Sequence, residues 1–458
     1  MIILEEGMTG EGNDRKKVIL AGVYETDGNP EPEERYRHSM EELWELAKAC
    51  GMDPQGEVTQ RLPHRNTAVY IGSGKLEEVR EMLEETGAEL VIFNDTLSPT
   101  QIKNLQKELG HEVMDRTALI LEIFKDRART REARLQVELA RLKYIKPRLI
   151  GMWETQNRQG GASGSQSSKG EGETQLELDR RQIDHRLAEL RRELVLVERE
   201  RATQRKRRQT AAIPLVSLVG YTNAGKSTIM NAFVNRYSRE EKKVFENDML
   251  FATLDTTIRR IETGNRQDFL ISDTVGFIQK LPTALVEAFK STLEEVTEAD
   301  LLLQVVDYSD PNYAEHMEVT QRIIAELGAG HIPMIIVYNK ADLADLPAPN
   351  QSSGYPRRGM SRREASGEPT ECIYISAKDP ASMEMLKNMI AEKVFSNHKE
   401  MEFFISYQDG AALSEMRKEA VILSQEYGND GVRVRLLCSP QQEVKWKRFQ
   451  KDISGSEL

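Results

Sequence analysis

The sequence predicts a multidomain α/β protein, and three observations support this prediction. Short apolar runs alternate with helical patterns over residues 17–115 and again over 211–398, which is typical of parallel sheets with crossover helices. Two long helical stripes separated by a loop rich in Gly and Ser lie between these regions. We therefore expect four parts: an N-terminal α/β subdomain over 1–115, a helical hairpin over 116–210, a second α/β domain over 211–398 and a small α+β domain over 399–458.

Size and composition exclude several classes of protein. The 458 residues suffice for two to four domains with hydrophobic cores, and 39% hydrophobic residues exclude disorder throughout. The three cysteines, Cys50, Cys372 and Cys438, are too few and too far apart for a disulfide framework or a zinc cluster. No segment approaches the roughly 18 apolar residues of a membrane helix, and the acidic N-terminus is unlike a signal peptide. We expect a cytoplasmic protein without a membrane span.

The first region is predicted to contain three strands and three helices. The apolar runs "KVILAGV", "TAVYIG" and "AELVIFND" are predicted to be strands. The segments "EERYRHSMEELWELAKAC", "GKLEEVREMLEETG" and "SPTQIKNLQKELG" have the apolar spacing of helices.

The middle region is predicted to be a hairpin of two long helices. One helix is expected over 115–144, with a Gly- and Ser-rich tip loop over 149–172 before the second. Each helix carries an apolar stripe at helical spacing: Leu135, Leu139, Leu142 and Ile145 on the first, and Leu176, Ile183, Leu187, Leu190, Leu194 and Val197 on the second. Antiparallel pairing of the two stripes is favoured, with packing of each stripe on its neighbouring domain as the alternative.

Basic residues gather in this hairpin although the whole chain has a formal net charge of -11. Nine Lys or Arg stand against three acidic residues between Lys125 and Arg148, and six of the ten residues from Arg199 to Arg208 are basic. Such charge indicates either a solvated helix surface or an element that contacts RNA.

The remaining regions contain an insertion and a small C-terminal unit. Residues 346–370 are rich in Pro, Ser, Gly and Arg without apolar periodicity, so a disordered surface insertion is predicted. The C-terminal unit is expected to run from a strand, "MEFFISY", through a helix, "AALSEMRKEAVILSQEY", to a strand, "GVRVRLLC", as a small βαβ-like domain.

A phosphate-binding loop follows the apolar strand "IPLVSLVG". Its glycines let backbone N–H groups surround the α- and β-phosphates, Lys226 contacts the β/γ oxygens, and the Ser227 hydroxyl can ligate Mg²⁺. A glycine turn that binds nothing is the alternative, but a strand before the loop and a helix after it are the context a phosphate loop requires. The predicted binding residues are Gly220, Tyr221, Thr222, Asn223, Ala224, Gly225, Lys226, Ser227 and Thr228.

A second phosphate-sensing element is predicted at the end of the strand "RQDFLIS". The carboxylate of Asp273 can hold Mg²⁺, and the N–H of Gly276 can contact a γ-phosphate because no Cβ stands in the way. Thr274 and Val275 lie between them. Phe277 occupies the position where many phosphate-hydrolysing switches have a Gln that orients the attacking water. We therefore expect slow intrinsic hydrolysis, accelerated when a partner arranges the water.

Two further motifs predict selection of guanine. Asp342 can accept hydrogen bonds from N1–H and the 2-amino group of guanine, a donor pair that adenine lacks, which disfavours an ATP-using enzyme. Asn339 can support the base and the phosphate loop, Lys340 can lie along the ring, and the N–H of Ala377 can contact guanine O6. The predicted residues are Asn339, Lys340, Ala341 and Asp342 in "NKAD" and Ser376, Ala377 and Lys378 in "SAK".

A threonine that senses Mg²⁺ and the γ-phosphate is expected between the phosphate loop and Asp273. The segment "NDMLFATLDTTIRRI" offers Thr253, Thr256 and Thr257, and their spacing does not choose among them. Such a segment orders with GTP and loosens with GDP.

These motifs occur in the order of a translation-factor-class GTPase and resemble the HflX family over about residues 17–450. The resemblance lies in "FATLD", in "DTVGFIQKLP", and in the Gly-rich segment that leads into "GETQLELDRRQIDHRL". It implies a Ras-like P-loop GTPase domain between the hairpin subdomain and the C-terminal domain. It also implies that Thr253 ligates Mg²⁺ with Ser227 and Asp273, within a nucleotide-contacting segment of Phe251, Ala252, Thr253, Leu254 and Asp255.

The resemblance also implies a function. The expected protein is a Mg²⁺-dependent GTPase that hydrolyses GTP to GDP, with Lys226, Thr253 and Gly276 as its catalytic residues. It implies a ribosome partner, mainly the 50S subunit and its rRNA, contacted by the hairpin and tip loop, and an activity of splitting or rescuing stalled ribosomes under stress. We expect a ribosome-associated monomer. The competing hypothesis is a ribosome-assembly or RNA-binding factor whose nucleotide domain serves only as a sensor.

Overall fold

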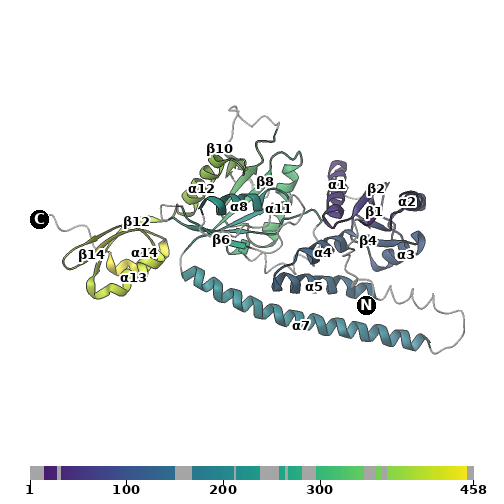
Figure 1. Ribbon diagram of the computed structural model, residues 1–458, viewed down its shortest axis with the longest axis horizontal. Helices are drawn as coiled ribbons and strands as arrows, with labels where there is room; N and C mark the ends of the chain where they lie inside the picture. Colours follow the sequence, from purple (N-terminus) through teal and green to yellow (C-terminus); the bar gives the residue numbers. More distant parts are fainter. Residues whose placement is uncertain are drawn as a thin grey trace. The chain divides into compact units, whose positions relative to one another are not determined.

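The computed structural model describes residues 15–27, 32–149, 168–210, 213–237, 257–263, 267–280, 295–344, 356–362 and 369–450 (Figure 1). These residues divide into two compact units. The first holds the residues up to Val195 together with Gln279 and Lys280, and the second holds the others. No helix in the described part of the chain is long and apolar enough to cross a membrane.

The first unit contains a four-stranded parallel sheet, as the alternating pattern predicts. Its strands are β1 (Lys17–Glu25), β2 (Asp53–Leu62), β3 (Leu90–Phe93) and β4 (Glu112–Asp115), in the order β2-β1-β3-β4. The connecting helices are α1 (Glu33–Ala49), α2 (Ser73–Thr86) and α3 (Pro99–Leu109). Parallel strands need crossovers of this kind, and β1 and β3 are buried almost throughout because helices cover the sheet.

The prediction of a strand at "TAVYIG" in this unit is wrong. Tyr70 has a φ of 68°, which a strand residue cannot adopt, and it exchanges two backbone hydrogen bonds with Asn66 at 2.9 and 3.1 Å. The segment is therefore a tight turn. The strand of the sheet is instead β2, which lies at the edge of the sheet, where alternating polar residues remain solvated.

The helical region differs from the prediction in two places. The expected single helix over 115–144 is two helices, α4 (Arg116–Arg127) and α5 (Arg131–Ile145), followed by the 3₁₀ turn η1 (Lys146–Arg148). The break arises because Ala128 is extended and Thr130 caps α5, its hydroxyl accepting from Ala133 N at 3.1 Å. The second long helix, α7, spans Ser168–Thr210, so residues 168–172 of the predicted loop are helical. Residues 150–167 lie outside the described residues.

The pairing of α5 with the first part of α7 is antiparallel, as the hairpin prediction requires (Figure 1). Residues later in α7 contact residues earlier in α5 and η1, through three ion pairs: Arg131 with Glu193 at 2.9 Å, Glu138 with Arg186 at 2.7 Å, and Lys146 of η1 with Asp184. Leu187 and Leu190 of the predicted stripe are buried. The ion pairs therefore join the two helices in one hairpin.

The carboxyl end of the four-stranded sheet carries a buried acid, Asp95, just after β3. Its Oδ1 accepts from Lys280 Nζ at 3.0 Å, its Oδ2 lies 3.3 Å from Arg65 Nη2, and the Tyr70 hydroxyl donates to it. Burial alone would raise the pKa of Asp95, but Lys280, Arg65 and the hydrogen bond from Tyr70 together hold this pKa below its usual value. The native state therefore favours the ionised carboxylate more than the unfolded chain does.

Asp95→Asn is expected to lower the free energy of unfolding by roughly 1–3 kcal/mol at pH 7, because it removes the negative charge that Lys280 and Arg65 contact. A lowered pKa contributes stability above the unfolded value of about 4, and this contribution is lost as pH falls through the native pKa. Urea unfolding at pH 7 and near pH 3 should therefore show the difference from wild type shrinking in acid. Asp27→Asn removes an exposed acid of the same unit and should change little at either pH. A difference for Asp95→Asn that stays constant with pH would contradict the ionised-acceptor assignment.

The second unit is built on a seven-stranded sheet with the order β10-β11-β9-β8-β5-β7-β6. Strands β11, β9, β8, β5 and β7 are parallel, and the two edge strands are antiparallel to them. The strands are β5 (Leu215–Gly220), β6 (Thr257–Ile261), β7 (Phe269–Asp273), β8 (Leu301–Asp307), β9 (Met334–Asn339), β10 (Arg357–Arg362) and β11 (Pro369–Tyr374), and the helices α8 (Lys226–Tyr237), α11 (Tyr313–Glu326) and α12 (Pro380–Val394). The carboxyl ends of β5, β7, β8 and β9 consequently meet at one edge, where open α/β sheets bind ligands.

The predicted disordered insertion over 346–370 is wrong in part. Residues 357–362 form β10, which pairs with β11 from Arg357 opposite Tyr374 to Arg362 opposite Pro369. The sequence "RRGMSR" has no apolar alternation because β10 is an edge strand. Residues 345–355 and 363–368 lie outside the described residues.

The C-terminal part folds as a three-stranded antiparallel sheet with the order β12-β14-β13, not as a βαβ unit. Its elements are β12 (Lys399–Ser406), the 3₁₀ turn η2 (Tyr407–Asp409), α13 (Gly410–Glu419), β13 (Val421–Tyr427), β14 (Gly431–Cys438), α14 (Pro440–Trp446) and the 3₁₀ turn η3 (Lys447–Phe449). The helix predicted through Tyr427 ends at Glu419, because Ala420 is extended and "VILSQEY" pairs with β14. The α+β character of this part is confirmed.

Candidate functional site

The phosphate loop lies between β5 and α8, as predicted. Gly225 has a φ of +93°, and a Cβ there would lie 2.2 Å from Asn339 Nδ2. A Cβ on Gly220 would lie 2.2 Å from the carbonyl oxygen of Val305. Glycine is therefore required at both positions, one for its backbone conformation and one for close approach to β8. The loop ends at the N-terminus of α8, where free N–H groups and the helix dipole favour an anion.

Lys226 is the buried cation of this loop. Its Nζ donates to the carbonyl oxygens of Gly220 at 2.9 Å and Tyr221 at 2.7 Å. Burial lowers the pKa of Lys226 to about 8, and the nearby Asp273 opposes this shift only partly. A phosphate bound at the loop would supply a further negative charge to stabilise the buried ammonium of Lys226.

The hydroxyl of Ser227 and the carboxylate of Asp273 are in direct contact. Ser227 Oγ donates to Asp273 Oδ2 at 2.7 Å, so β7 and α8 place two oxygen ligands side by side. Hard oxygen ligands of this kind suit Mg²⁺, which binds through one or two carboxylates together with phosphate oxygens. The residues present therefore fit the metal that the sequence predicts.

Gly276 lies against the phosphate loop. A Cβ on it would lie 2.7 Å from Thr222 Cγ2 and 3.1 Å from Lys226 Nζ. Thr274 and Val275 are buried, and the Thr274 hydroxyl donates to the carbonyl oxygen of Leu218 at 2.6 Å. The Asp273–Gly276 segment thus brings one backbone position, Gly276, next to the predicted phosphate lysine, while the side chains of Thr274 and Val275 turn into the protein.

Phe277 is part of the hydrophobic core. Its N–H donates to Gly220 O at 3.1 Å and its carbonyl accepts from Thr222 N at 2.8 Å, so its backbone is joined to the phosphate loop. Its side chain is 1% exposed and packs with apolar residues of β5, β8 and α11, among them Val219, Leu302 and Ile324. The aromatic ring therefore faces the core. Another group has to position the attacking water.

Asn339 joins the two guanine motifs to the phosphate loop. Its Nδ2 donates to Ala224 O at 3.0 Å, and its Oδ1 accepts from Ala377 N at 3.0 Å. The support of the phosphate loop expected from Asn339 is present. The N–H of Ala377, predicted to contact guanine O6, here donates to Asn339.

The other residues of the guanine motifs surround this junction. Asp342 and Lys378 are exposed, so both side chains are accessible to a ligand. Ala341 N donates to Ile375 O at 3.0 Å, and Ser376 N to Ser382 Oγ at 3.2 Å, which ties the two motifs to the sheet and to α12. In contrast, Phe251, Ala252, Thr253, Leu254, Asp255 and Thr256 lie outside the described residues. Thr257 is the first residue of β6.

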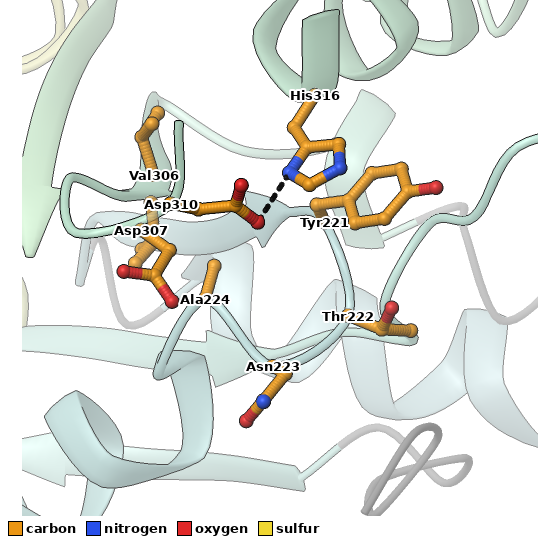
Figure 2. A pocket seen from close by; sticks show the side chains of 9 residues that line it. Tyr221, Thr222, Asn223, Ala224, Val306, Asp307, Asp310 and His316 are labelled. Carbon is orange, nitrogen blue, oxygen red and sulfur yellow. Dashed lines mark ion pairs between the residues drawn. The ribbon is translucent and has the colours of Figure 1, made fainter. Parts of the chain in front are cut away.

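A small hollow lies beside the phosphate loop (Figure 2). The Tyr221 ring stacks on His316 with centroids 3.8 Å apart and an interplanar angle of 9°, and His316 Nδ1 lies 3.5 Å from Asp310 Oδ2. At about 60 Å³ the hollow is smaller than the several hundred Å³ of a ligand pocket. The Asn223 side chain points away from it in Figure 2 and is exposed. Sequence reasoning missed His316 and Asp310, because no motif connects them to the phosphate loop.

Three family models match consecutive parts of the chain. They are described as "GTP-binding GTPase N-terminal" over residues 37–125, "GTP-binding GTPase Middle Region" over 127–208 and "50S ribosome-binding GTPase" over 215–340. The third covers the phosphate loop, the Asp273–Gly276 segment and Asn339.

Curated relatives match along nearly the whole chain. A protein of Caldanaerobacter subterraneus subsp. tengcongensis named "GTPase HflX" is 40% identical over 437 residues, covering 95% of this chain and 94% of the relative. A protein of Escherichia coli with the same name is 34% identical and covers 95% of this chain and 96% of the relative. Among solved structures, a GTP-binding protein from Sulfolobus solfataricus in complex with GDP is 22% identical, with a TM-score of 0.41, over 83% of this chain and 99% of that one.

Proposed function

Since the chain belongs to the HflX family of GTPases and hydrolyses GTP, we propose that it is a GTP-dependent switch that binds the large ribosomal subunit and splits or rescues stalled ribosomes. The observation that carries the GTPase part is the convergence of the phosphate loop, Asp273 and Asn339 at one edge of the sheet. The ribosomal part is supported by the match of residues 215–340 to the model described as a "50S ribosome-binding GTPase". Such a partner would place the protein in the cytoplasm.

The nucleotide would be held at both of its ends. The N–H groups at the start of α8 surround the phosphates, and Lys226 moves from the carbonyl oxygens of Gly220 and Tyr221 to the phosphate oxygens. Asp342 accepts from the guanine edge, and Asn339 holds its motif against the loop. Ser227, Asp273 and, as we propose, Thr253 would hold Mg²⁺, which neutralises charge on the β- and γ-phosphates.

The γ-phosphate would be sensed by Gly276, which lies next to Lys226 Nζ. The buried Phe277 ring leaves the attacking water without a positioning group from this residue. Hydrolysis is therefore slow in the free protein and accelerates when the ribosome supplies or arranges such a group.

The basic hairpin is the proposed RNA contact. Three ion pairs with α7 neutralise part of the charge of the hairpin: two are made by α5 and one by η1. Six basic residues stand against one acid from Arg199 to Arg208, and nine stand against three from Lys125 to Arg148, so the hairpin carries a positive surplus. Phosphate contacts of this kind provide sequence-independent affinity that falls with salt.

GTP hydrolysis measured with and without purified large ribosomal subunits tests this function. We expect the large subunit to raise the rate at least about tenfold, since a missing positioning group costs more than that. Small subunits at the same concentration are the control and should have little effect. An unchanged rate with large subunits would overturn the ribosomal switch and favour a nucleotide sensor in assembly or RNA binding.

Asp342→Asn is expected to weaken GTP binding by about 100-fold or more, because two hydrogen bonds from guanine lose their charged acceptor. Asparagine can accept from N1–H of xanthine and donate to its 2-oxygen, so binding of xanthosine triphosphate should improve in the same variant. Competition binding with both nucleotides measures the exchange. Unchanged selectivity would show that Asp342 does not select the base.

A further inference from the structure

The carboxyl ends of β8 and β9 place two side chains of opposite charge next to each other. Asp307 and Asn339 are register partners in the two strands, and Tyr308 N donates to Asn339 O at 2.8 Å. The next residue, Lys340, has a φ of 58°. This conformation is costly for a residue with a Cβ, and such strain gathers at functional sites. The positive φ changes the direction of the chain after β9, and the ammonium of Lys340 lies next to Asp307 at the end of β8.

Each oxygen of Asp307 has a separate role. Oδ1 accepts from Ser309 N at 3.1 Å and from Ser309 Oγ at 2.6 Å, which fixes the carboxylate in the loop after β8. Oδ2 lies 2.7 Å from Lys340 Nζ. The carboxylate is therefore oriented by its own loop before it contacts the lysine.

We propose that Asp307 is a positioning residue for guanine recognition, and that it acts by holding Lys340 along the base. This inference rests on the proposed assignment of Lys340 to the nucleotide site. Asp307 itself lies outside every nucleotide-binding motif of the sequence. The lysine side chain is otherwise among the most flexible, and ordering it on binding weakens affinity. An ion pair that orders it beforehand removes that cost.

The pair is better suited to positioning than to stability. The side chains of Lys340 and Asp307 are 27% and 17% exposed, and pairs that are accessible to water contribute little to folding. Ordering one rotamer-rich side chain changes affinity by about three- to tenfold. Because the base is bound alike before and during hydrolysis, the loss should appear in KM and in the Kd of both GTP and GDP, with kcat unchanged.

Asp307→Asn is the most selective variant. It keeps an oxygen for Ser309 and replaces the charged partner of Lys340 by an amide. Glu326→Gln is the matched control, since Glu326 is an exposed acid at the end of α11 in the same unit. Both changes remove one negative charge, so general charge effects cancel in the comparison.

The test is a double-mutant cycle in the full-length protein, with Asp307→Asn, Lys340→Ala and the double variant. The readouts are Kd for GDP, KM and kcat for GTP, and Tm without nucleotide. We expect Asp307→Asn to weaken binding three- to tenfold, Glu326→Gln to have little effect, and Asp307→Asn to add nothing once Lys340 is alanine.

The other outcomes separate the two claims. If Lys340→Ala leaves affinity unchanged, the assignment of Lys340 to the nucleotide site is wrong, and the inference fails with it. If Lys340→Ala weakens binding but Asp307→Asn does not, the site assignment stands and the inference is overturned. Two results would show that Asp307 has only a structural role. One is that the losses of affinity from the two single variants add in the double variant. The other is that the loss of affinity is accompanied by a lowered Tm.

Discussion

Replacing Lys226 by methionine is expected to lower GTP hydrolysis by about 100- to 1,000-fold while leaving the fold intact. The phosphate loop places the ammonium beside Gly276, where we propose that the γ-phosphate binds and charge develops on it. Its burial lowers the pKa of the lysine to about 8, so the folded protein bears a cost for holding the charge. Methionine fills a similar space without that cost, and the Tm without nucleotide should therefore equal or exceed that of wild type.

The measurement is single-turnover hydrolysis at saturating GTP, together with the Tm of the nucleotide-free protein. Lys393→Met on α12 removes a half-buried lysine of the same unit that pairs with Glu371, and it serves as the control. A methionine variant at position 226 that is folded and hydrolyses GTP at the wild-type rate would contradict the assignment of the phosphate lysine.

Phe277→Gln should destabilise the protein by about 3–5 kcal/mol without accelerating hydrolysis. The phenyl ring packs in the cluster beneath the phosphate loop, and the change removes that packing and buries an amide without partners. The new amide would stand in the core, where it cannot orient a water at the γ-phosphate. Urea unfolding and the rate of hydrolysis in the absence of ribosomes measure the two effects.

Phe277→Leu is the matched change, because it keeps an apolar side chain in the same cluster. Its cost should be clearly smaller, at about 1.5 kcal/mol or less. If the glutamine variant proves as stable as the leucine variant and hydrolyses GTP faster than wild type, the side chain at position 277 faces the nucleotide instead of the core.

The candidate nucleotide site could be predicted because the residues that form it lie in short, contiguous segments of the sequence. Gly225, Lys226 and Ser227 are adjacent, and a strand and a helix on either side fix their placement. The parallel order of β5, β7, β8 and β9 then follows from the crossovers, so the ends of these strands meet without further information. The bridge from Asn339 to the phosphate loop was predicted for the same reason.

The features that the sequence did not predict depend on contacts between distant segments. The register of β8 with β9 is what places Asp307 beside Lys340, and no local pattern encodes that register. Strand β10 exists because β11 supplies its hydrogen bonds, since its own residues lack apolar alternation. The core position of Phe277 depends on α11 and β8, although the residue itself stands in a motif of the site.

The break between α4 and α5 does have a local signal in the sequence. Thr130 caps α5 through its side chain, and threonine before a helical segment is a start signal for a helix. It predicts a break in the helical region without any Gly or Pro.

Co-sedimentation with ribosomes is the sharpest test of a GTP-dependent ribosomal switch, because it measures partner binding and nucleotide dependence together. The protein would be spun with large ribosomal subunits in the presence of GDP or of a non-hydrolysable GTP analogue, at two salt concentrations. We expect more protein in the pellet with the GTP analogue, and less of it at higher salt, as phosphate contacts from the basic hairpin require. Equal binding with both nucleotides would contradict a GTP-dependent switch that acts on the ribosome.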